Sequence, residues 1–282
     1  MRRIAVVIVT YNNASMLRAL LADLAKQSRQ PDEIVVVDND SIDHTSRMMV
    51  EEFASVQYLR LAENTGSAGG YYAGVHAVMA TADGIWTLDD DVHLESDSLE
   101  NLVAGYHELA KKFRLGAVRS INDDYKHIVP VELENVPWRG ALWVGDVVRL
   151  MGPPRSDYFL YGEDLEYSLR MRSHGFCCYW VPTSRCIEVR QGKTDGRLFG
   201  KPVRIYPTAF RLYYAFRNEF NIDAAYHRID RLARLCLYAV KVVGYVALTE
   251  GMGGYKKIMA VSTGLWHGLT GRLGKNPRYL PS

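Results

Sequence analysis

Cysteine is scarce in this chain, and its few cysteines show no pattern that binds a metal or forms disulfides. Among 282 residues there are four, namely Cys177, Cys178, Cys186 and Cys236. Two of them are adjacent, and none has the spacing of metal ligands. Such a set is typical of buried thiols in a reducing compartment rather than of a disulfide framework. We therefore expect a cytoplasmic protein.

Long apolar runs and targeting signals are also missing. The longest apolar run, residues 235–248, contains Lys241 and has 14 residues, whereas a membrane-spanning helix needs about 20. The N-terminus carries Arg2 and Arg3 before a short apolar run, and no signal-peptide core or cleavage site follows. The sequence thus predicts no transmembrane helix, while contact with a membrane surface stays open.

The net charge is small but unevenly distributed. The chain has 34 basic and 32 acidic residues, a formal charge of +2, which does not indicate a nucleic-acid partner. From Ala224 to Ser282 nine basic and two acidic residues give +7, and the preceding residues carry −5. A basic tail on an acidic body predicts contact with something anionic.

Short β-branched runs alternate with helical patterns in the first half of the chain. Strands are predicted at residues 4–9, 33–37, 56–61 and 85–88, and helices at 14–27, 41–53 and 68–80. Apolar strands joined by helices indicate an α/β fold with a mostly parallel, Rossmann-like sheet flanked by helices. Ligands bind at the carboxyl ends of such strands, so candidate binding loops begin at Thr10, Asp38, Ala62 and Asp89.

The second half of the chain is less regular. Strands are predicted at residues 141–148, 176–181 and 185–189, a helix at 163–173, and helices from Pro207 onward. We place the domain boundary near residue 205. Residues 1–205 then form the α/β domain, which contains the candidate binding loops, and residues 206–282 form a C-terminal helical region.

Three consecutive carboxylates, Asp89, Asp90 and Asp91, directly follow a predicted strand. Oxygen ligands in this position suit Mn²⁺ or Mg²⁺, which would in turn hold a substrate diphosphate. The alternative is a solvated turn before the next helix.

A loop of small residues, 64–74, precedes these carboxylates and opens a helix. Small residues let a ligand approach the backbone, and a helix N-terminus attracts anions. No Gly-Lys-Ser/Thr follows, so it is not a P-loop. Close packing of the helix against the sheet explains the small residues equally well.

A second acidic pair, Glu163 and Asp164, begins a predicted helix. A carboxylate exposed there could take a proton from a hydroxyl nucleophile. Plain capping of the helix N-terminus is the alternative.

Together these segments resemble glycosyltransferase family 2, whose members have the GT-A fold. The resemblance is carried by residues 7–12, 37–45, 64–74, 88–91, 159–170, 217–218 and 266–274, which follow the expected order along nearly the whole chain. Within the family, the Ala68-Gly69-Gly70-Tyr71 loop and the triple Asp are most similar to bacterial galactofuranosyl- and rhamnosyltransferases.

The resemblance implies roles for individual residues. Asp164 is the general base, and Glu163 helps to position the acceptor hydroxyl. Many relatives have Asp at the position of Asn39, so a uracil or a thymine base remains open. The implied donor-binding residues are Thr10, Tyr11, Asn12, Asp38, Asn39, Asn64, Gly66, Ala68, Gly69, Gly70, Asp89 and Asp90.

The metal site implied by the resemblance departs from the family in one position. Asp89 and Asp91 are expected to bind Mn²⁺ or Mg²⁺. Many relatives complete the site with a His, which falls at Glu188 here. Either Glu188 is a ligand through oxygen, or it is structural and the cation is held by Asp91, the diphosphate and water.

The acceptor is expected between residues 138–143 and 158–164. Sugars stack on aromatic rings, so Trp138 and Tyr161 are candidates, although core aromatics are the simpler interpretation. Arg139 is a candidate contact for an acceptor phosphate, and a solvated position is the alternative.

The predicted helix 230–248 has an apolar face and a basic face. This pattern is consistent with an enzyme on the inner face of an anionic cytoplasmic membrane that meets a lipid-linked acceptor there. Packing against the catalytic domain, or formation of an oligomer, explains the apolar stripe equally well.

The leading hypothesis is an inverting, metal-dependent glycosyltransferase. It transfers galactofuranose from UDP-galactofuranose, or rhamnose from dTDP-rhamnose, to a bacterial surface glycan such as an O-antigen or another lipid-linked polysaccharide. A sugar nucleotidyltransferase is one alternative, but Thr10–Asn13 offers no basic glycine-rich loop for a triphosphate. The other is a non-catalytic glycan-binding or nucleotide-sugar-binding module, which only the missing His favours.

Overall fold

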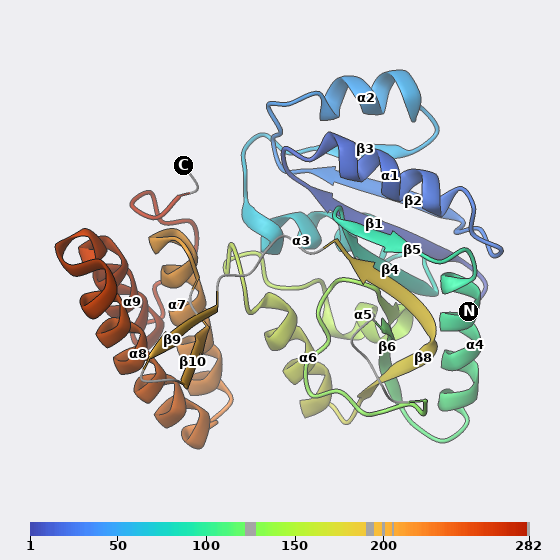
Figure 1. Ribbon diagram of the computed structural model, residues 1–282. Coiled ribbons are helices and arrows are strands. Elements are labelled where there is room, and N and C mark those ends of the chain that lie inside the picture. Colours follow the sequence, from blue (N-terminus) through green and yellow to red (C-terminus); the bar gives the residue numbers. More distant parts are fainter. Residues whose placement is uncertain (122–127, 190–194, 199–200, 205, 281–282) are drawn as a thin grey trace. The chain divides into compact units, whose positions relative to one another are not determined.

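The computed structural model describes residues 1–121, 128–189, 195–198, 201–204 and 206–280. These form two compact units (Figure 1). The first comprises Met1–Ser156 and Asp164–Val189, and the second comprises Asp157–Glu163 and Arg190–Ser282. The domain boundary predicted at residue 205 lies outside the described residues.

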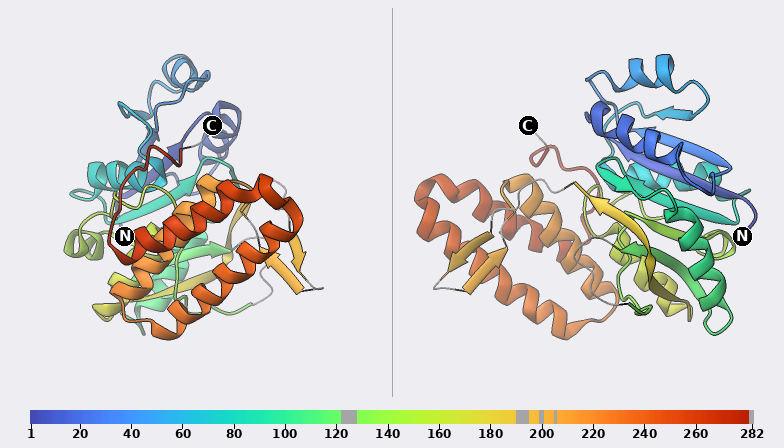
Figure 2. Two further views of the ribbon diagram at one scale, coloured as in Figure 1. Left: turned by 90° about the vertical axis from the view of Figure 1, so that its left-hand side faces the viewer. Right: turned by 45° about the vertical axis from the view of Figure 1, so that its right-hand side comes forward.

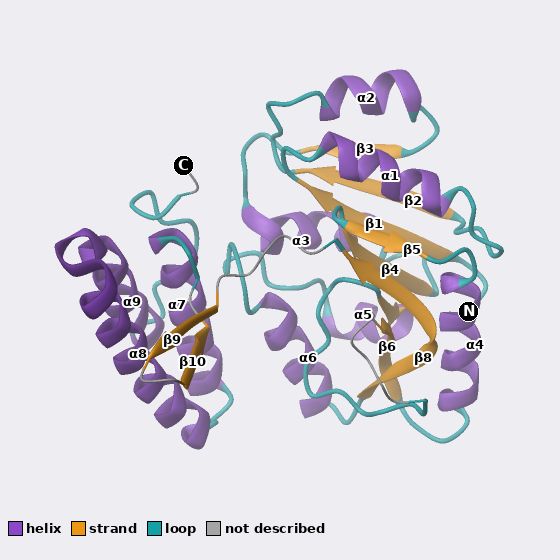
Figure 3. Cartoon of the chain, viewed as in Figure 1, coloured by secondary structure: helices purple, strands orange, loops and turns teal. Residues whose placement is uncertain are grey.

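The first unit is built on an eight-stranded sheet with the order β3-β2-β1-β4-β7-β6-β8-β5 (Figure 3). The strands are β1 (Ile4–Thr10), β2 (Glu33–Asp38), β3 (Gln57–Arg60), β4 (Gly84–Asp89), β5 (Val92–Leu94), β6 (Leu115–Ile121), β7 (Ala141–Val144) and β8 (Cys177–Glu188). The helices are α1 (Ala14–Leu24), α2 (Thr45–Glu52), α3 (Gly66–Val78), α4 (Ser98–Ala110), α5 (Gly145–Met151) and α6 (Glu163–Ser173).

The parallel arrangement predicted for the first half is confirmed for β3, β2, β1 and β4. The second half differs, because β7 is antiparallel to both β4 and β6, and β5 is antiparallel to β8. The strand predicted at residues 141–148 ends at Val144, where α5 takes over. A short apolar run does not distinguish a strand from a buried helix, and Val147 and Val148 are buried on that helix.

The two strands predicted on either side of Pro182 are a single strand, β8. Ser120 pairs with Val181 and Ile121 with Arg185, so residues 182–184 bulge out of the ladder. Proline lacks the N–H that a sheet ladder needs, and a bulge accommodates it.

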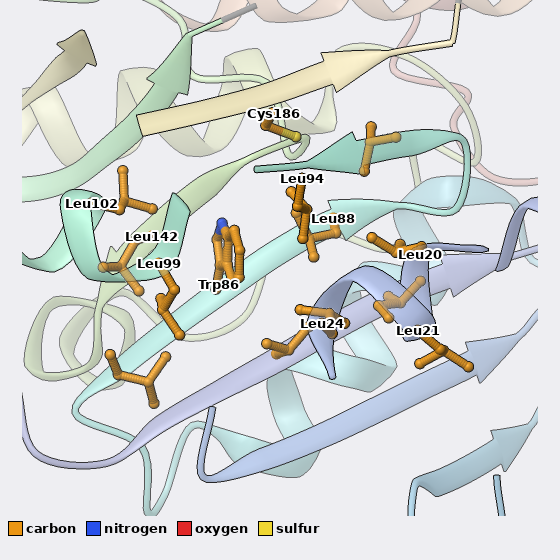
Figure 4. Close-up of a cluster of buried hydrophobic side chains, with 14 of the residues drawn as sticks. Leu20, Leu21, Leu24, Trp86, Leu88, Leu94, Leu99, Leu102, Leu142 and Cys186 are labelled. Carbon is orange, nitrogen blue, oxygen red and sulfur yellow. The ribbon is translucent and has the colours of Figure 1, made fainter. Parts of the chain in front are cut away.

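Alternation along the strands fills a core on each face of the sheet. Ile4, Val6 and Ile8 of β1 face the core covered by α1, α2 and α4, and Ala5 and Val7 face the core covered by α3, α5 and α6. Figure 4 shows part of the first core, in which leucines of α1 and α4 surround Trp86 and Leu88 of β4. Burial on both faces is what the near-continuous apolar strands predicted.

Over residues 206–280, the second unit forms three α-helices, in agreement with the helical pattern predicted from Pro207 onward. They are α7 (Ala209–Ala225), α8 (Ile229–Glu250) and α9 (Tyr255–Leu269), with a short 3₁₀ helix, η1 (Gly251–Gly254), between the last two. A β-hairpin of β9 (Asp195–Leu198) and β10 (Lys201–Arg204) precedes them and was not predicted. Figure 2 shows α8 and α9 side by side, and both pack on α7.

Two glycines allow α9 to lie close to α7. A Cβ at Gly264 would come within 2.7 Å of the Tyr213 carbonyl oxygen, and one at Gly268 within 2.5 Å of the Arg217 carbonyl oxygen. Only glycine fits such a close backbone approach. The core between these helices contains Tyr213, Tyr214 and Phe216 of α7.

Arg217 is fully buried in the second unit and fixes the segment Asp157–Glu163. Its guanidinium donates hydrogen bonds to the carbonyl oxygens of Tyr158 and Gly274, both at 2.6 Å. The Asn218 amide donates to the carbonyl oxygens of Tyr158, Leu160 and Tyr161 at 2.7–3.0 Å. These bonds satisfy the backbone of a loop in which Phe159, Tyr161 and Gly162 have positive φ.

By length and composition, Ile229–Leu269 forms a helical run able to cross a membrane. Its best 18-residue window has a mean hydropathy of 1.5 and is 22% buried. The expectation of no transmembrane helix considered the uninterrupted apolar run alone. Core helices of soluble proteins meet the same criteria of length and composition, so that expectation stays a prediction.

Candidate active site

The carboxyl ends of β1, β2 and β4 bring the predicted loops together. In the sheet register Thr10 lies opposite Asp38, and Val9 lies opposite Asp89. The polar residues that follow these strands therefore gather at one edge of the sheet, where open α/β sheets bind ligands.

Asp90 ties two of these loops together. One carboxylate oxygen accepts a hydrogen bond from Thr10 Oγ1 at 2.6 Å, and the other accepts one from Asn13 Nδ2 at 2.9 Å. Burial raises the pKa of Asp90 to about 7, although these two bonds act in the opposite direction. Asp90 and Thr10, both predicted to bind the donor, are thus engaged with each other.

Asp38 and Asn39 likewise hold neighbouring loops. Asp38 is fully buried and accepts hydrogen bonds from Ser41 N and the Tyr58 hydroxyl. Asn39, 3% exposed, accepts bonds from Thr65 N and Oγ1 and donates to the Gly66 carbonyl oxygen at 2.7 Å. The Asn39 amide thus fixes the start of α3, and its role in donor binding stays a prediction.

Tyr11 and Asn12 differ from these buried residues. The Tyr11 side chain is 41% exposed, so its ring is open to a stacking ligand. Asn12 has φ of +52° and its Oδ1 accepts a hydrogen bond from Ile42 N at 2.8 Å. Asn12 therefore shapes the loop that presents Tyr11.

The small residues of the loop 64–74 serve close packing of α3. Asn64 Oδ1 accepts a hydrogen bond from Gly66 N, and Gly66 begins α3 with φ of +73°. A Cβ at Gly69 would lie 2.2 Å from Thr65 Oγ1, and one at Gly70 would lie 2.5 Å from Val9 Cγ1. Ala68 is fully buried. The packing alternative thus accounts for the glycines here.

Asp89 and Asp91, the two neighbours of Asp90, are further carboxylates at this edge of the sheet. Asp89 accepts a hydrogen bond from the Tyr71 hydroxyl at 2.6 Å. Burial and the charge of Asp89 raise the pKa of Asp91. Pairing of β5 with β8 brings Asp91 beside Glu188, because Val189 N donates to the Asp91 carbonyl oxygen and Val92 pairs with Glu188.

Glu188 forms an ion pair with the guanidinium of Arg139. Arg139 Nη1 lies 2.9 Å from Glu188 Oε1. Burial would lower the pKa of Arg139, but the charges of Asp89 and Glu188 raise it. Across the described ranges, no three His, Cys, Asp or Glu side chains form a group able to hold a metal ion. The carboxylates of Asp89 and Asp91 are suitable ligands for Mn²⁺ or Mg²⁺, whereas Glu188 is already paired.

Asp164 lies in the first turn of α6, and its Oδ1 accepts a hydrogen bond from Leu165 N at 2.7 Å. Burial raises the pKa of Asp164 to about 6, and the charge of Asp89 adds to this rise. The backbone N–H of Leu165 and the charge of Arg119 act in the opposite direction. A carboxylate with this pKa is ionised at neutral pH and can still accept a proton.

Arg119 was missed by the sequence analysis. It is 5% exposed on β6, its guanidinium stacks 4.4 Å from the centre of the Trp180 ring, and burial lowers its pKa to about 10. Its Nε donates to the Arg139 carbonyl oxygen at 2.9 Å. An arginine in the middle of a buried strand was the signal that could have revealed it.

Glu163 and Tyr161 belong to the second unit. Glu163 is buried. Tyr161 has φ of +67°, and its ring lies 5.1 Å from that of Tyr206. Burial raises the pKa of Tyr161 to about 12, so its hydroxyl stays protonated.

Trp138 is a core residue of the first unit. It is 5% exposed and packs against the rings of Tyr71, Trp143 and Tyr167 at 4.8–5.5 Å. This burial speaks against an open platform for a sugar and fits the alternative of a core aromatic.

Comparison with known proteins adds to this geometry. Residues 5–179 match Glycosyl transferase family 2. The chain is 27% identical over 214 residues to the galactofuranosyltransferase GlfT1 of Mycolicibacterium smegmatis, covering 65% of this chain and 68% of the relative. It is 27% identical over 212 residues to GlfT1 of Mycobacterium tuberculosis, covering 64% and 67%.

Solved structures share the fold. GalNAc-T7, solved with UDP, GalNAc and Mn²⁺, has a TM-score of 0.60 at 15% identity; the match covers 79% of this chain and 47% of that chain. The mannosyltransferase PcManGT of Pyrobaculum calidifontis, in complex with GDP-Man and Mn²⁺, has a TM-score of 0.59 at 16% identity; the match covers 98% and 77%. These likenesses confirm the GT-A fold with a C-terminal helical extension.

Proposed function

The chain belongs to glycosyl transferase family 2, and on this premise we propose that it transfers galactofuranose from UDP-galactofuranose to a bacterial cell-surface glycan. Galactofuranosyltransferases match 65% and 64% of the chain, which supports this donor. dTDP-rhamnose is the second donor. Membership of the family favours sugar transfer over the nucleotidyltransferase and binding-module alternatives.

The observation that carries the proposal is that Asp89, Asp91 and Asp164 share one unit, in which the charge of Asp89 raises the pKa of both Asp91 and Asp164. Asp164 accepts the proton of the acceptor hydroxyl, and Glu163 helps to position that hydroxyl. The hydroxyl oxygen bonds to the anomeric carbon from the face opposite the nucleotide. The bond from that carbon to the diphosphate oxygen breaks, and UDP leaves with the electron pair. A single displacement inverts the configuration.

Asp89 and Asp91 would hold Mn²⁺ or Mg²⁺ next to the donor diphosphate. When bound, such a cation offsets the negative charge that develops on the leaving group. Their hard carboxylate oxygens and the raised pKa of Asp91 support this assignment, because a nearby cation would relieve the repulsion between the two acids.

For the nucleotide, we propose that Tyr11 stacks on the base. Asn12, Asn64 and Gly66 act through the backbone that they shape, and the same holds for the buried Thr10, Asp38 and Asn39. In this view the donor contacts come from exposed side chains and main-chain groups at the edge of the sheet, and residues 1–205 form the catalytic domain.

The C-terminal helices suit an acceptor at a membrane. On α8, Leu237, Val240 and Leu248 are exposed, and Arg234 and Lys241 are exposed on the same helix. We propose peripheral contact with the anionic inner face of the cytoplasmic membrane, where a lipid-linked glycan is available. The variant Leu237→Glu/Val240→Glu should lose co-flotation with vesicles containing anionic lipid; unchanged flotation, or a protein that dimerises instead, would contradict this contact.

The donor is tested by thermal unfolding with UDP-galactofuranose, UDP-galactose, dTDP-rhamnose and GDP-mannose, each with and without Mn²⁺. A ligand that binds the native state raises Tm by mass action. We expect the largest rise with UDP-galactofuranose in Mn²⁺, followed by transfer to a glycan acceptor in a turnover assay. No rise with any sugar nucleotide would refute the proposed function.

A further inference from the structure

Arg139 places a guanidinium among carboxylates at the edge of the sheet. Its Nη1 lies 2.9 Å from Glu188 Oε1, and its side chain is 21% exposed. Its Nε–H is buried and meets no hydrogen-bond acceptor within the described part of the chain. Glu188 lies near Asp91, because β5 pairs with β8 at this point. The guanidinium is therefore held by Glu188 and retains hydrogen-bonding capacity.

The backbone around Arg139 is fixed by three strands. Arg119 of β6 donates to the Arg139 carbonyl oxygen at 2.9 Å. Gly140 N donates to the Thr87 carbonyl oxygen of β4, and Ser120 N donates to the Gly140 carbonyl oxygen, both at 2.9 Å. Gly140 has φ of +73°, and a Cβ there would lie 2.9 Å from Cys186 Cβ. The backbone that carries Arg139 is therefore fixed, and the contact with Glu188 holds the end of the side chain.

A carboxylate bound to a guanidinium is a poor additional ligand for a divalent cation. A divalent cation bound by Glu188 would lie next to the Arg139 guanidinium, and the repulsion between these two positive charges disfavours that arrangement. Glu188 bound to Arg139 leaves Asp89 and Asp91 for the cation. The planar, permanently charged guanidinium of Arg139 then lies near Asp89 and Asp91. Its N–H groups are arranged so that they can bind two phosphate oxygens at once.

We propose that Glu188 is a positioning residue rather than a metal ligand, and that it orients Arg139 to bind the diphosphate of the nucleotide-sugar donor. This inference rests on the proposed function, since it assumes a nucleotide-diphosphate donor at this edge of the sheet. Arg139 then supplies positive charge to the leaving diphosphate that does not depend on the metal.

The test measures binding of UDP and of uridine by isothermal titration calorimetry, in EDTA and in Mn²⁺. Arg139→Met should weaken UDP binding about 10- to 100-fold in EDTA, as expected for loss of a charge-assisted hydrogen bond, and should leave uridine binding unchanged. Arg139→Lys should give an intermediate loss. Arg172→Met is the matched control, because it removes an arginine–glutamate pair of 2.7 Å with Glu132 elsewhere on the first unit.

Glu188→Gln separates the two roles of that residue. We expect it to weaken UDP binding in EDTA in the same direction as Arg139→Met and to leave the affinity for Mn²⁺ alone unchanged, measured by electron paramagnetic resonance of free Mn²⁺. Weaker Mn²⁺ binding together with unchanged UDP binding in EDTA would overturn the inference and make Glu188 a ligand.

Other outcomes are equally decisive. If UDP binds to Arg139→Met as tightly as to the wild type, the inference fails while the proposed function stands. If the wild type binds neither UDP nor dTDP under any condition, the proposed function fails and the inference fails with it. Far-ultraviolet circular dichroism and Tm of each variant identify a folding defect, and uridine binding by Arg139→Lys then reports on the intact site.

Discussion

Two groups of polar side chains in the first unit use their hydrogen-bonding capacity differently. In the first group, Asp38, Asn39 and Asp90 direct their side-chain oxygens to N–H or O–H groups of neighbouring loops. The second group comprises Asp91 and Asp164, whose pKa values are raised by burial and by the charge of Asp89. Asp90 shares this rise, but its two carboxylate oxygens are held by Thr10 and Asn13.

From this difference we predict which residues build the loops and which are available to a ligand. Satisfied buried polar groups rigidify a structure, and the first group does so for the loops after β1, β2 and β4. Like charges held close together cost free energy and are typical of functional sites. Arg139 and Glu188 belong to the second group because their pair lies among these carboxylates.

The largest expected effect comes from removing the carboxylate of Asp164, the proposed general base of the second group. Asp164→Asn should lower kcat about 10²- to 10⁴-fold, the range for general base catalysis, and should leave the Kd for UDP unchanged. Turnover and calorimetry on the same preparation measure both. Asp146→Asn, which alters an exposed acid on α5, is the matched control. Full transfer by Asp164→Asn would refute the base assignment.

The raised pKa of Asp164 predicts a pH dependence. The protonated acid cannot accept the hydroxyl proton, so kcat/KM should fall about tenfold per pH unit below the pKa of about 6. Above pH 7 the acid is ionised and the profile should level off. A profile measured from pH 5 to 8 that is flat on the acid side would contradict this role.

A matched pair of aspartates distinguishes the two groups by stability. Asp90→Ala leaves Thr10 Oγ1 and Asn13 Nδ2 without their acceptor and should lower the free energy of unfolding by about 1–3 kcal/mol. Asp91→Ala removes a charge whose burial is unfavourable, so the free energy of unfolding should stay unchanged or rise slightly. Urea unfolding of both variants provides the measurement. The reverse order would break the division proposed above.

Substitutions of two glycines are expected to have the smallest effect. Gly70→Ala places a Cβ 2.5 Å from Val9 Cγ1, and overpacking of this kind costs about 1–3 kcal/mol. Gly244→Ala, in α8 where a Cβ would meet nothing within 4 Å, should stabilise by about 0.5–1 kcal/mol. Urea unfolding and UDP binding are measured for both. If Gly70→Ala keeps its stability and loses UDP, the loop binds the donor directly.

Much of the fold could be predicted because the apolar strands of the first half are buried on both faces. Runs such as β1 and β2 have few other interpretations, and the helices between them have clear apolar stripes. The prediction failed where a local pattern was ambiguous. Val147 and Val148 extend an apolar run that is a strand up to Val144 and a helix after it. The bulge at residues 182–184 depends on pairing with β6, which no local pattern reveals.

The site was harder to predict because the type of a residue does not determine which groups it contacts in the folded chain. Asp89, Asp90 and Asp91 are identical in the sequence, yet Asp90 is engaged by Thr10 and Asn13 and the other two are not. The function of Asn39 depends on Thr65, a residue 26 positions away in the chain. The pair of Arg139 and Glu188 joins positions that come together only because residues 139 and 140 bond to β6 and β6 pairs with β8.

The hydrogen bonds that the Arg217 and Asn218 side chains donate to backbone carbonyl oxygens limit how far this protein can be shortened. The family match ends at residue 179, which suggests a catalytic fragment without the C-terminal helices. Such a fragment would keep the residues just before Asp164 but lose the side chains that hold the carbonyls of Tyr158, Leu160 and Tyr161. We therefore expect residues 157–163 to lose their conformation in such a fragment, and deletion libraries should leave α7 intact.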